Sequence, residues 1–185
     1  VVAAVDLTNN AISNGQAIDL YKFTVTASGG DVALKQFTFP ISWSDGVSAD
    51  TLTLGSFKFY KNGSDITSNV NMMSNAGVSA SASDALTGDT SLLEANTSLI
   101  VSYTSEDVVA SGETATFIVR GTPSLFAIAN GTTAGADSVT LYLAGDVADN
   151  LASDGTTAMK YLNEQSASSL GINIWRLLFF YFFVF

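Results

Sequence analysis

The chain of 185 residues contains no cysteine and no histidine. These two absences exclude disulfides, thiolate and imidazole metal sites, and the Ser-His-Asp and Cys-His centres of hydrolases. The sequence also has only two prolines and seven basic residues, and its formal net charge is -10. The basic residues do not cluster, which argues against nucleic acid and anionic lipid as partners.

Only 13% of the residues are charged, so uncharged Ser, Thr, Asn and Gly must cover much of the surface. This composition is typical of an exported β protein, and the length suits one domain with a substantial core. The chain starts at Val1 without Met or a signal-type segment. We therefore expect an export signal to lie outside this segment, and the chain to be a piece of a longer protein.

Two strongly alternating apolar runs lie between Leu20 and Trp43, joined by Gly29-Gly30-Asp31. Alternation with period two is typical of half-buried strands, and the glycines provide the positive φ that a reversal needs. The stretch therefore predicts a β-hairpin. Its second run changes parity near Lys35-Gln36, which predicts a β-bulge there.

The segment FKFYKNGSDI predicts a second hairpin, because Asn62-Gly63 is the strongest short turn signal. A change of parity at Gly55-Ser56 predicts another bulge just before it. Val1–Leu7 is either an edge strand or the end of a linker, and residues 69–91 are either a long loop or one weak edge strand. Leu125–Ile128 is either a short strand or a helical turn. Alternation predicts further strands around Leu99–Tyr103, Ala115–Val119 and Val139–Leu143.

Counted from Tyr21, these patterns give about seven strands at intervals of about ten residues, without a sustained helical period. The sequence therefore predicts an all-β fold, an Ig-like antiparallel β-sandwich with Greek-key connections and almost no helix. Its expected core is a set of aromatic residues, for which packing is a commoner role than ligand binding: Tyr21, Phe23, Phe37, Phe39, Trp43, Phe57, Phe59 and Phe117.

The strings SNGQAIDLYKFTVTASGGDVALKQFTF, GSFKFYKNGSDI, SGETATFIVRGT and ADSVTLYLAGD resemble the Ig-like repeat modules in large cell-surface proteins of uncultured candidate-phylum bacteria. The likeness runs from about Ile12 to about Asp146 and consists of strand texture and turn residues. It implies an Ig-like fold, an extracellular location at the cell surface, and a structural or adhesive role. It transfers no active-site residue.

The C-terminal segment Gly171–Phe185 is almost wholly apolar and does not alternate. We divide the chain into a sandwich domain, 1–165, and an apolar tail, 166–185. Leu177–Phe185 is much shorter than the roughly 20 residues of a membrane-spanning helix. The tail is therefore a truncated membrane anchor, an artefact of a shifted reading frame, or a buried strand pair. We expect residues from about Ile172 onward to add nothing to the sandwich, and a membrane is a partner only if the tail is a genuine anchor.

A group of acidic residues around the last predicted strand suggests one metal site, composed of Asp137, Asp146, Asp149 and Asp154 near Asn150. Calcium takes such hard oxygen ligands, although the spacing lacks the DxDxDG order of calcium loops. The alternative is that these are solvated loop acids. We expect no other cofactor.

No catalytic constellation emerges from the remaining polar motifs. Glu106 and Asp107 are neighbours on a strand and so point to opposite faces, unlike the facing carboxylates of glycosidases. Three triplets beginning at Asn62, Asn96 and Asn130 match the glycosylation pattern, but short Ser/Thr-rich sequences produce such matches by chance. We therefore expect that the protein is not an enzyme.

Two functions remain. The first is a non-catalytic structural or adhesive module of a larger bacterial surface protein, with neighbouring modules, surface glycans or surface proteins as partners. The alternative is a carbohydrate-binding module, which requires exposed aromatic residues beside polar loops. The parity of the strands predicts that Trp43 is buried and that Tyr60 and Tyr142 are exposed, whereas Tyr103 also has to be located before the two can be distinguished.

Overall fold

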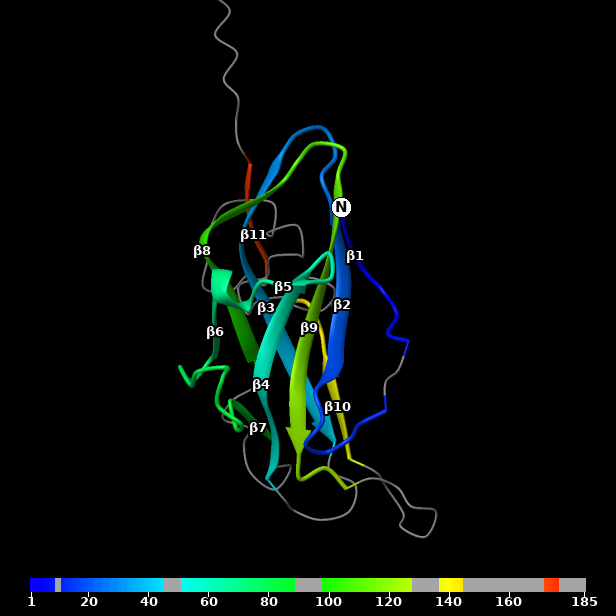
Figure 1. Cartoon of the computed structure of the whole chain (residues 1–185), viewed down its shortest axis with the longest axis vertical. Helices are drawn as coiled ribbons and strands as arrows, with labels where there is room; N and C mark the ends of the chain where they lie inside the picture. The colour runs from blue at the N-terminus through cyan, green and yellow to red at the C-terminus, as the bar shows by residue number, and fades with distance from the viewer. Residues whose placement is uncertain (9–10, 45–50, 89–97, 128–136, 145–171, 177–185) are drawn as a thin grey trace, which may run out of the picture.

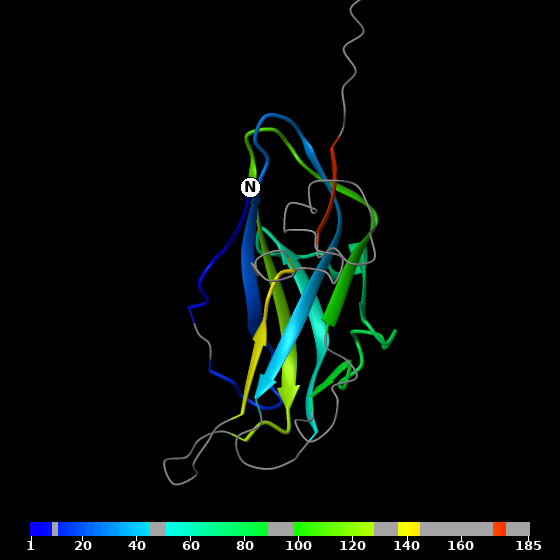
Figure 2. The same ribbon diagram turned by 180° about the vertical axis from the view of Figure 1, so that it is seen from behind.

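The computed structural model describes residues 1–8, 11–44, 51–88, 98–127, 137–144 and 172–176. The fold is all-β, with two antiparallel sheets packed face to face as a β-sandwich (Figures 1 and 2). The described residues form no α-helix, and their only helical turn is the 3-10 helix η1, Thr67–Asn69. Accordingly, this part of the chain has no apolar helix of membrane-spanning length.

Sheet A lies in front in Figure 1 and has six strands, in the order β1-β2-β9-β4-β5 with β7 also paired to β4. Its strands are β1 (Val2–Ala4), β2 (Ile18–Thr26), β9 (Thr114–Ser124), β4 (Leu52–Lys61), β5 (Ser64–Asp65) and β7 (Leu86–Gly88). The pairing of β1 with β2 confirms the edge-strand alternative for the start of the chain.

Sheet B lies in front in Figure 2 and has five strands, in the order β10-β3-β8-β6 with β11 also paired to β3. Its strands are β10 (Ser138–Leu141), β3 (Val32–Ser44), β8 (Ser98–Val109), β6 (Val70–Ser74) and β11 (Ile172–Arg176). The region 69–91 thus contributes edge strands to both sheets, namely β6 beside β8 and β7 beside β4.

The predicted hairpin between Leu20 and Trp43 is wrong, because its two strands belong to different sheets. β2 pairs with β9, whereas β3 pairs with β8. The connection is an arch over the end of the sandwich, and the β8–β9 connection forms a second arch beside it (Figure 1). The two arches satisfy each other's backbone groups: the Ala27 N–H donates to the Glu113 carbonyl at 3.0 Å and the Gly112 N–H to the Ala27 carbonyl at 2.8 Å. The Asp31 side chain also accepts the Ser111 N–H at 2.8 Å.

The second hairpin and both predicted bulges are confirmed. Asn62 and Gly63 both have positive φ in the turn between β4 and β5, and Lys61 pairs with Ser64. The pairing of β3 with β8 changes register between Leu34 and Gln36. The pairing of β4 with β9 changes register between Gly55 and Lys58.

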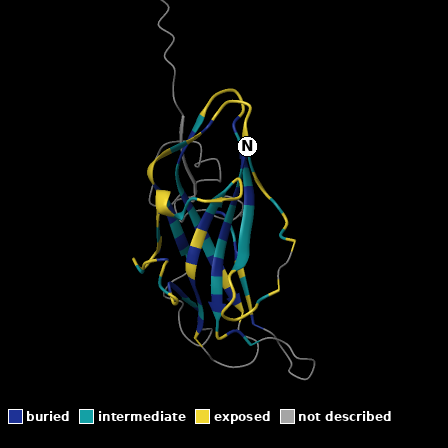
Figure 3. Ribbon diagram, in the orientation of Figure 1, coloured by how far each residue is buried: buried dark blue, intermediate teal, exposed yellow. Residues whose placement is uncertain are grey.

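Aromatic rings from both sheets form the core, shown as the buried inner faces in Figure 3. Phe37 of β3 lies 5.0 Å from Phe23 of β2 and 5.6 Å from Phe117 of β9, measured between ring centroids. Phe117 in turn stacks on Phe23 and on Phe59 of β4. Of the eight aromatic residues predicted to be core, all are buried except Tyr21, which is half-buried.

The chain after β9 is neither a strand nor a helical turn over the described residues 125–127. Leu125 has a φ of 64°, which turns the chain away from the sheet. The Asn14 side chain then donates to the Phe126 carbonyl at 2.7 Å and accepts the Phe126 N–H at 3.1 Å. An amide side chain thus takes the place of a neighbouring strand. Ile128 lies outside the described residues.

The structure differs from the sequence prediction at β11. Antiparallel pairing joins Ile172 to Phe37 and Arg176 to Val32, so this piece of the predicted tail belongs to sheet B. β8 pairs with one edge of the long β3 strand, and β10 covers only the second half of the other edge. β11 pairs with the first half of that other edge. The proposed boundary at 165/166 and the run 177–185 lie outside the described residues.

Candidate functional site

Of the four acidic residues proposed for calcium, the structure describes only Asp137. This residue is buried, and its Oδ2 accepts the Ala127 N–H at 2.6 Å, while its own N–H donates to the Ala127 carbonyl at 3.0 Å. Asp137 therefore joins the start of β10 to the segment that follows β9. Asp146, Asp149 and Asp154 lie outside the described residues, as does Asn150. The described residues contain no group of three acidic, His or Cys side chains suited to a metal ion.

The adjacent Glu106 and Asp107 on β8 have different surroundings. Glu106 is exposed, whereas both Asp107 carboxylate oxygens lie 2.7 Å from Lys61 Nζ. Lys61 is the last residue of β4, so this ion pair joins sheet A to sheet B. Its Nζ also lies 6.0 Å from the centre of the Phe117 ring. Because the ammonium contacts both carboxylate oxygens and the pair is half-buried, this ion pair connects the two sheets.

The exposure of four aromatic residues distinguishes a structural or adhesive module from a carbohydrate-binding module. Trp43 is buried, as predicted, and so is Tyr103. The prediction that Tyr60 and Tyr142 are exposed is wrong, because both are half-buried. The indole N–H of Trp43 and the hydroxyl of Tyr103 have no hydrogen-bond partner within the described structure. Burial, together with the nearby charge of Asp107, raises the pKa of Tyr103. Tyr60 belongs to sheet A and Tyr142 follows a strand of sheet B, so the two rings do not share a platform.

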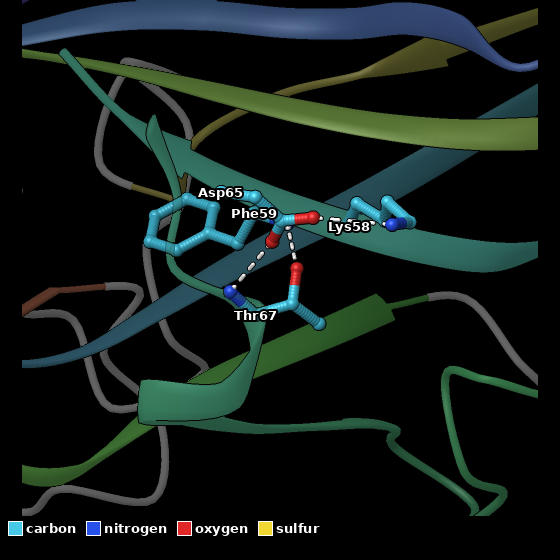
Figure 4. A network of polar contacts seen from close by, with 4 residues as sticks. All are labelled: Lys58, Phe59, Asp65 and Thr67. Atoms are coloured by element: carbon cyan, nitrogen blue, oxygen red, sulfur yellow. Dashed lines mark hydrogen bonds and ion pairs between the residues drawn. The ribbon is translucent and has the colours of Figure 1, made fainter. Parts of the chain in front are cut away.

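A polar cluster stabilises the hairpin between β4 and β5. Figure 4 shows Asp65 between Lys58 and Thr67, with its Oδ2 3.1 Å from Lys58 Nζ and its Oδ1 3.0 Å from the Thr67 N. The Thr67 hydroxyl accepts the Phe59 N–H at 2.9 Å. Hydrogen bonds from the Thr67 side chain and backbone lower the pKa of Asp65 to about 2. The carboxylate also raises the pKa of Lys58.

A second ion pair lies on the outer face of sheet A. Arg120 Nε donates to Asp19 Oδ1 at 2.7 Å, and this bond raises the pKa of Arg120. The guanidinium lies 4.9 Å from the centre of the Tyr60 ring, a cation–π contact. Lys58 pairs with Arg120 in the ladder between β4 and β9. Strand pairing therefore brings together charged residues that are far apart in the chain.

The outer face of sheet B has a different character. The outward residues of β3 beyond its bulge are Gln36, Thr38, Pro40, Ser42 and Ser44, and those at the start of β8 are Ser98, Ile100 and Ser102. Asn71 and Met73 continue this surface on β6, and Ser138, Thr140 and the following Tyr142 continue it on the side of β10. None of these side chains is charged. We call this set the neutral face.

Hydrogen bonds connect the polar side chains in the middle of the neutral face. The Ser102 hydroxyl donates to Gln36 Oε1 at 3.2 Å, and Gln36 Nε2 donates to the Thr38 hydroxyl at 3.4 Å. In the strand ladder, Thr38 is paired with Ile100, which is paired with Met73 of β6. Along this line of paired residues, the side chains are apolar on β6 and β8 (Met73 and Ile100) and polar on β3 (Thr38).

A cavity of about 400 Å³ adjoins the neutral face at β6. Its apolar lining includes Phe57, Val70 and Met72, and its polar lining includes Asn71 and Ser81. The segment 79–82 bounds it, because the Ala80 N–H donates to the Met72 carbonyl while its carbonyl accepts the Phe57 N–H. The cavity therefore lies where this segment bridges sheet B and sheet A. A second cavity, of about 180 Å³, lies between Thr8 and the Asp19–Arg120 pair.

Comparisons with protein-family models, with curated proteins and with solved structures gave no match. The candidate site consequently rests on its geometry alone.

Sequence reasoning did not identify the neutral face. The relevant signal was present in the strings PISWS and SLIVSY, where uncharged residues alternate with core residues. That alternation identifies the buried side of each strand but not which outward residues become neighbours. Comparing the outward residues of β3 and β8 required knowing that these strands are neighbours.

Proposed function

We propose that the chain is a non-catalytic structural or adhesive module of a larger extracellular protein at a bacterial cell surface. The observation that carries this proposal is the way both sheets are fastened to each other. Phe37 of sheet B contacts three rings of sheet A, and the half-buried Lys61–Asp107 pair adds a polar connection at one end. A sandwich fastened in this way suits a rigid spacer that holds its surface away from the cell.

We assign the sandwich to the Ig-like Greek-key type, with its end strands exchanged. In an Ig domain, strands A, B, E and D form one sheet and C, F and G the other. If the main strands β2, β3, β4, β6, β8, β9 and β10 are lettered A to G, the present sheets are G-B-E-D and A-F-C. The pairings B–E, E–D and C–F agree with the Ig arrangement. Strands A and G have changed sheets, which supports a Greek-key relative of that fold.

The surface chemistry supports an extracellular role. With a net charge of -10, the protein repels other acidic molecules. Three of its basic residues, Lys58, Lys61 and Arg120, are already paired with carboxylates. These three ion pairs therefore serve the fold.

The proposal is tested by location and by stability. Antibodies against the folded chain should label intact cells that carry the gene as strongly as permeabilised ones. The purified chain should resist thermolysin at 37 °C in its native state, because cleavage then requires opening of the sandwich. Labelling only after permeabilisation, or rapid cleavage within the described strands, contradicts the proposal.

The second candidate is a carbohydrate-binding module with an aromatic platform. Tyr60 lies under Arg120 on sheet A and Tyr142 lies on the opposite sheet, which does not favour such a platform.

The calcium hypothesis has a direct test. If Asp137, Asp146, Asp149 and Asp154 hold the ion in the folded state, millimolar calcium raises the melting temperature relative to chelator by mass action. Asp149→Asn should abolish this increase, whereas Asp84→Asn, away from the group, should leave it intact. Equal melting temperatures in calcium and chelator contradict the calcium site.

A further inference from the structure

We propose that the neutral face of sheet B and the adjoining cavity beside β6 bind an uncharged polysaccharide. The inference rests on the proposed adhesive function and names the chemical class of its partner. It depends on three features of the described residues: the absence of charge on the face, the hydrogen-bonding groups in its centre, and the cavity at its edge.

The two outer faces differ in charge along most of their length, since Lys35 and Glu106 of sheet B lie at the bulge between β3 and β8, outside the neutral face. On sheet A, strand pairing brings together Lys58, Arg120 and Asp19. On sheet B, the outward side chains of the neutral face are uncharged across four strands, although the chain carries 17 acidic residues. An acidic or basic polymer would find no opposite charge on this face. An uncharged polymer can approach it without displacing an ion pair.

The centre of the face matches the hydrogen-bonding chemistry of sugars. Hydroxyl and amide groups act as both donors and acceptors, as sugar hydroxyls do. The Ser102–Gln36–Thr38 network orients three such side chains on neighbouring strands. Ile100 and Tyr142 provide half-buried apolar surface beside them, suited to the C–H faces of sugar rings.

The cavity provides a place for one unit of the polymer. Its volume of about 400 Å³ lies within the range of small-molecule sites, roughly 300–1,000 Å³. Its lining combines an apolar floor with hydroxyl and amide groups and includes no charged residue. Asn71 and Met73 belong both to the cavity and to the neutral face, so the two surfaces are continuous.

The composition of the face distinguishes a polysaccharide from a protein partner. Protein–protein interfaces are enriched in Tyr, Trp, Met and Arg and depleted in Ser. The neutral face has four serines on β3 and β8 (Ser42, Ser44, Ser98 and Ser102) and a single Tyr at its edge. A second copy of the chain would also bring a further charge of -10 close to the first.

The experiment measures retention of the full chain, held in solution by a mild non-ionic detergent, by neutral polysaccharides, in affinity gels containing soluble β-glucan, mannan or dextran and on particles of cellulose or chitin. Polygalacturonate serves as the anionic arm. Thr38→Lys places a charge in the centre of the neutral face, and Ser81→Trp places a large ring at the cavity. The matched control is Thr116→Lys, which places the same charge on the central strand of sheet A, at a half-buried position like that of Thr38.

We expect at least one neutral polysaccharide to bind, with a dissociation constant that rises about tenfold in Thr38→Lys and in Ser81→Trp, the cost of about one lost hydrogen bond. Thr116→Lys should bind like the unmodified chain, and circular dichroism should show that all variants remain folded.

Three results overturn the inference: no neutral polysaccharide binds, polygalacturonate binds more tightly, or Thr116→Lys has the same effect as Thr38→Lys. A dimer in sedimentation that Thr38→Lys abolishes also overturns it, in favour of a second copy. If the polysaccharide test fails but antibodies label intact cells, the proposed surface module stands and its partner is of another chemical class.

Discussion

Phe37 is the residue on which the interior depends most. Its ring lies within 6.4 Å, between centroids, of five other aromatic rings: those of Phe23, Phe39, Phe59, Tyr103 and Phe117. These rings come from β2, β3, β4, β8 and β9, so this one side chain contacts all the central strands of both sheets. Offset and edge-to-face ring pairs add about 0.5–1.5 kcal/mol each beyond the burial of area.

Phe39→Ala tests the core beside this residue. Phe39 is fully buried, and its ring lies 5.9 Å from Phe23. Truncation should lower the free energy of unfolding by about 3–5 kcal/mol, because a large cavity forms between the sheets. Denaturation in urea measures the loss. The control is Thr38→Ala on the outer face of the same strand, expected to cost under about 1 kcal/mol. A loss for Phe39→Ala as small as that of the control would place it outside the core.

Asp65 gives a prediction about pH. Its pKa falls from 3.8 in the unfolded chain to about 2 in the folded protein, chiefly through hydrogen bonds from Thr67. A lowered pKa stabilises the folded state above the unfolded pKa, and this stabilisation is lost as the pH falls from about 4 through 2. Asp65→Asn should therefore flatten the decline in unfolding free energy between pH 5 and 2. Urea denaturation at several pH values tests this, and parallel curves for the two proteins would contradict it.

Burial of single residues was predictable because period-two alternation separates the two sides of a strand. Phe23, Phe37 and Phe117 are buried for this reason. Tyr21 shares this parity but is only half-buried, although its partner Val119 in the ladder is buried. The candidate site was not predictable, since its residues come from strands whose neighbours the alternation does not identify.

At the scale of elements, the bulge in β4 connects a strand to a loop. The Ser56 N–H donates to the Ala82 carbonyl and the Phe57 N–H to the Ala80 carbonyl, both at 2.8 Å. These bonds hold the segment 79–82 against sheet A and shape the cavity. Gly55 permits the close approach, because a side chain there would overlap the backbone of Ala82 and Ser83.

Gly55→Ala should therefore cost about 1–3 kcal/mol, the range for overpacking in a buried place. Gly29→Ala is the matched comparison: its φ of 77° is unfavourable for alanine, but the surrounding space is open. It should cost about 1 kcal/mol. Thermal unfolding of the two variants provides the measurement. If Gly29→Ala proves the more damaging, the close contact at the bulge is not important for stability.

The two connections rich in glycine illustrate what local sequence specifies. Asn62-Gly63 was correctly interpreted as a hairpin, because two successive positive φ values produce a tight turn in any context. Gly29-Gly30-Asp31 has the same local freedom but belongs to an arch. What distinguishes the arch is its hydrogen bonding to the β8–β9 connection. The Asp31 side chain accepts the N–H of Ser111, which lies 80 residues later in the chain. No local pattern carries that information.

At the scale of the whole molecule, the C-terminal segment has two parts with different expected effects. β11 pairs with β3, whereas the following residues Leu177–Phe185 form an uncharged apolar run. Exposed runs of this kind promote aggregation. A chain ending at Arg176 should thus be soluble and monomeric, while the full chain should aggregate or require detergent. Light scattering and sedimentation distinguish the two results.

A chain ending at Ser169 separates the two parts of the tail. It lacks β11 and leaves the first half of β3 as an open edge. We expect it to lose at least about 1 kcal/mol relative to the chain ending at Arg176, a lowering of the melting temperature by about 2–4 °C. Equal melting temperatures would show that β11 contributes nothing, as the sequence first suggested.

The pairing of β2 with the distant strand β9 also determines when the protein can fold during its synthesis. Asp19 of β2 and its partner Arg120 of β9 are 101 residues apart. Ribosomes add about 5–20 residues per second, so β2 waits roughly 5–20 seconds for the strand beside it. Throughout that interval Phe23 and Val25 face water on a strand without its main neighbour. If the chain is exported, as we propose, a domain that closes only after most of its length has emerged suits passage through a secretion channel as an unfolded chain, with folding completed on the far side.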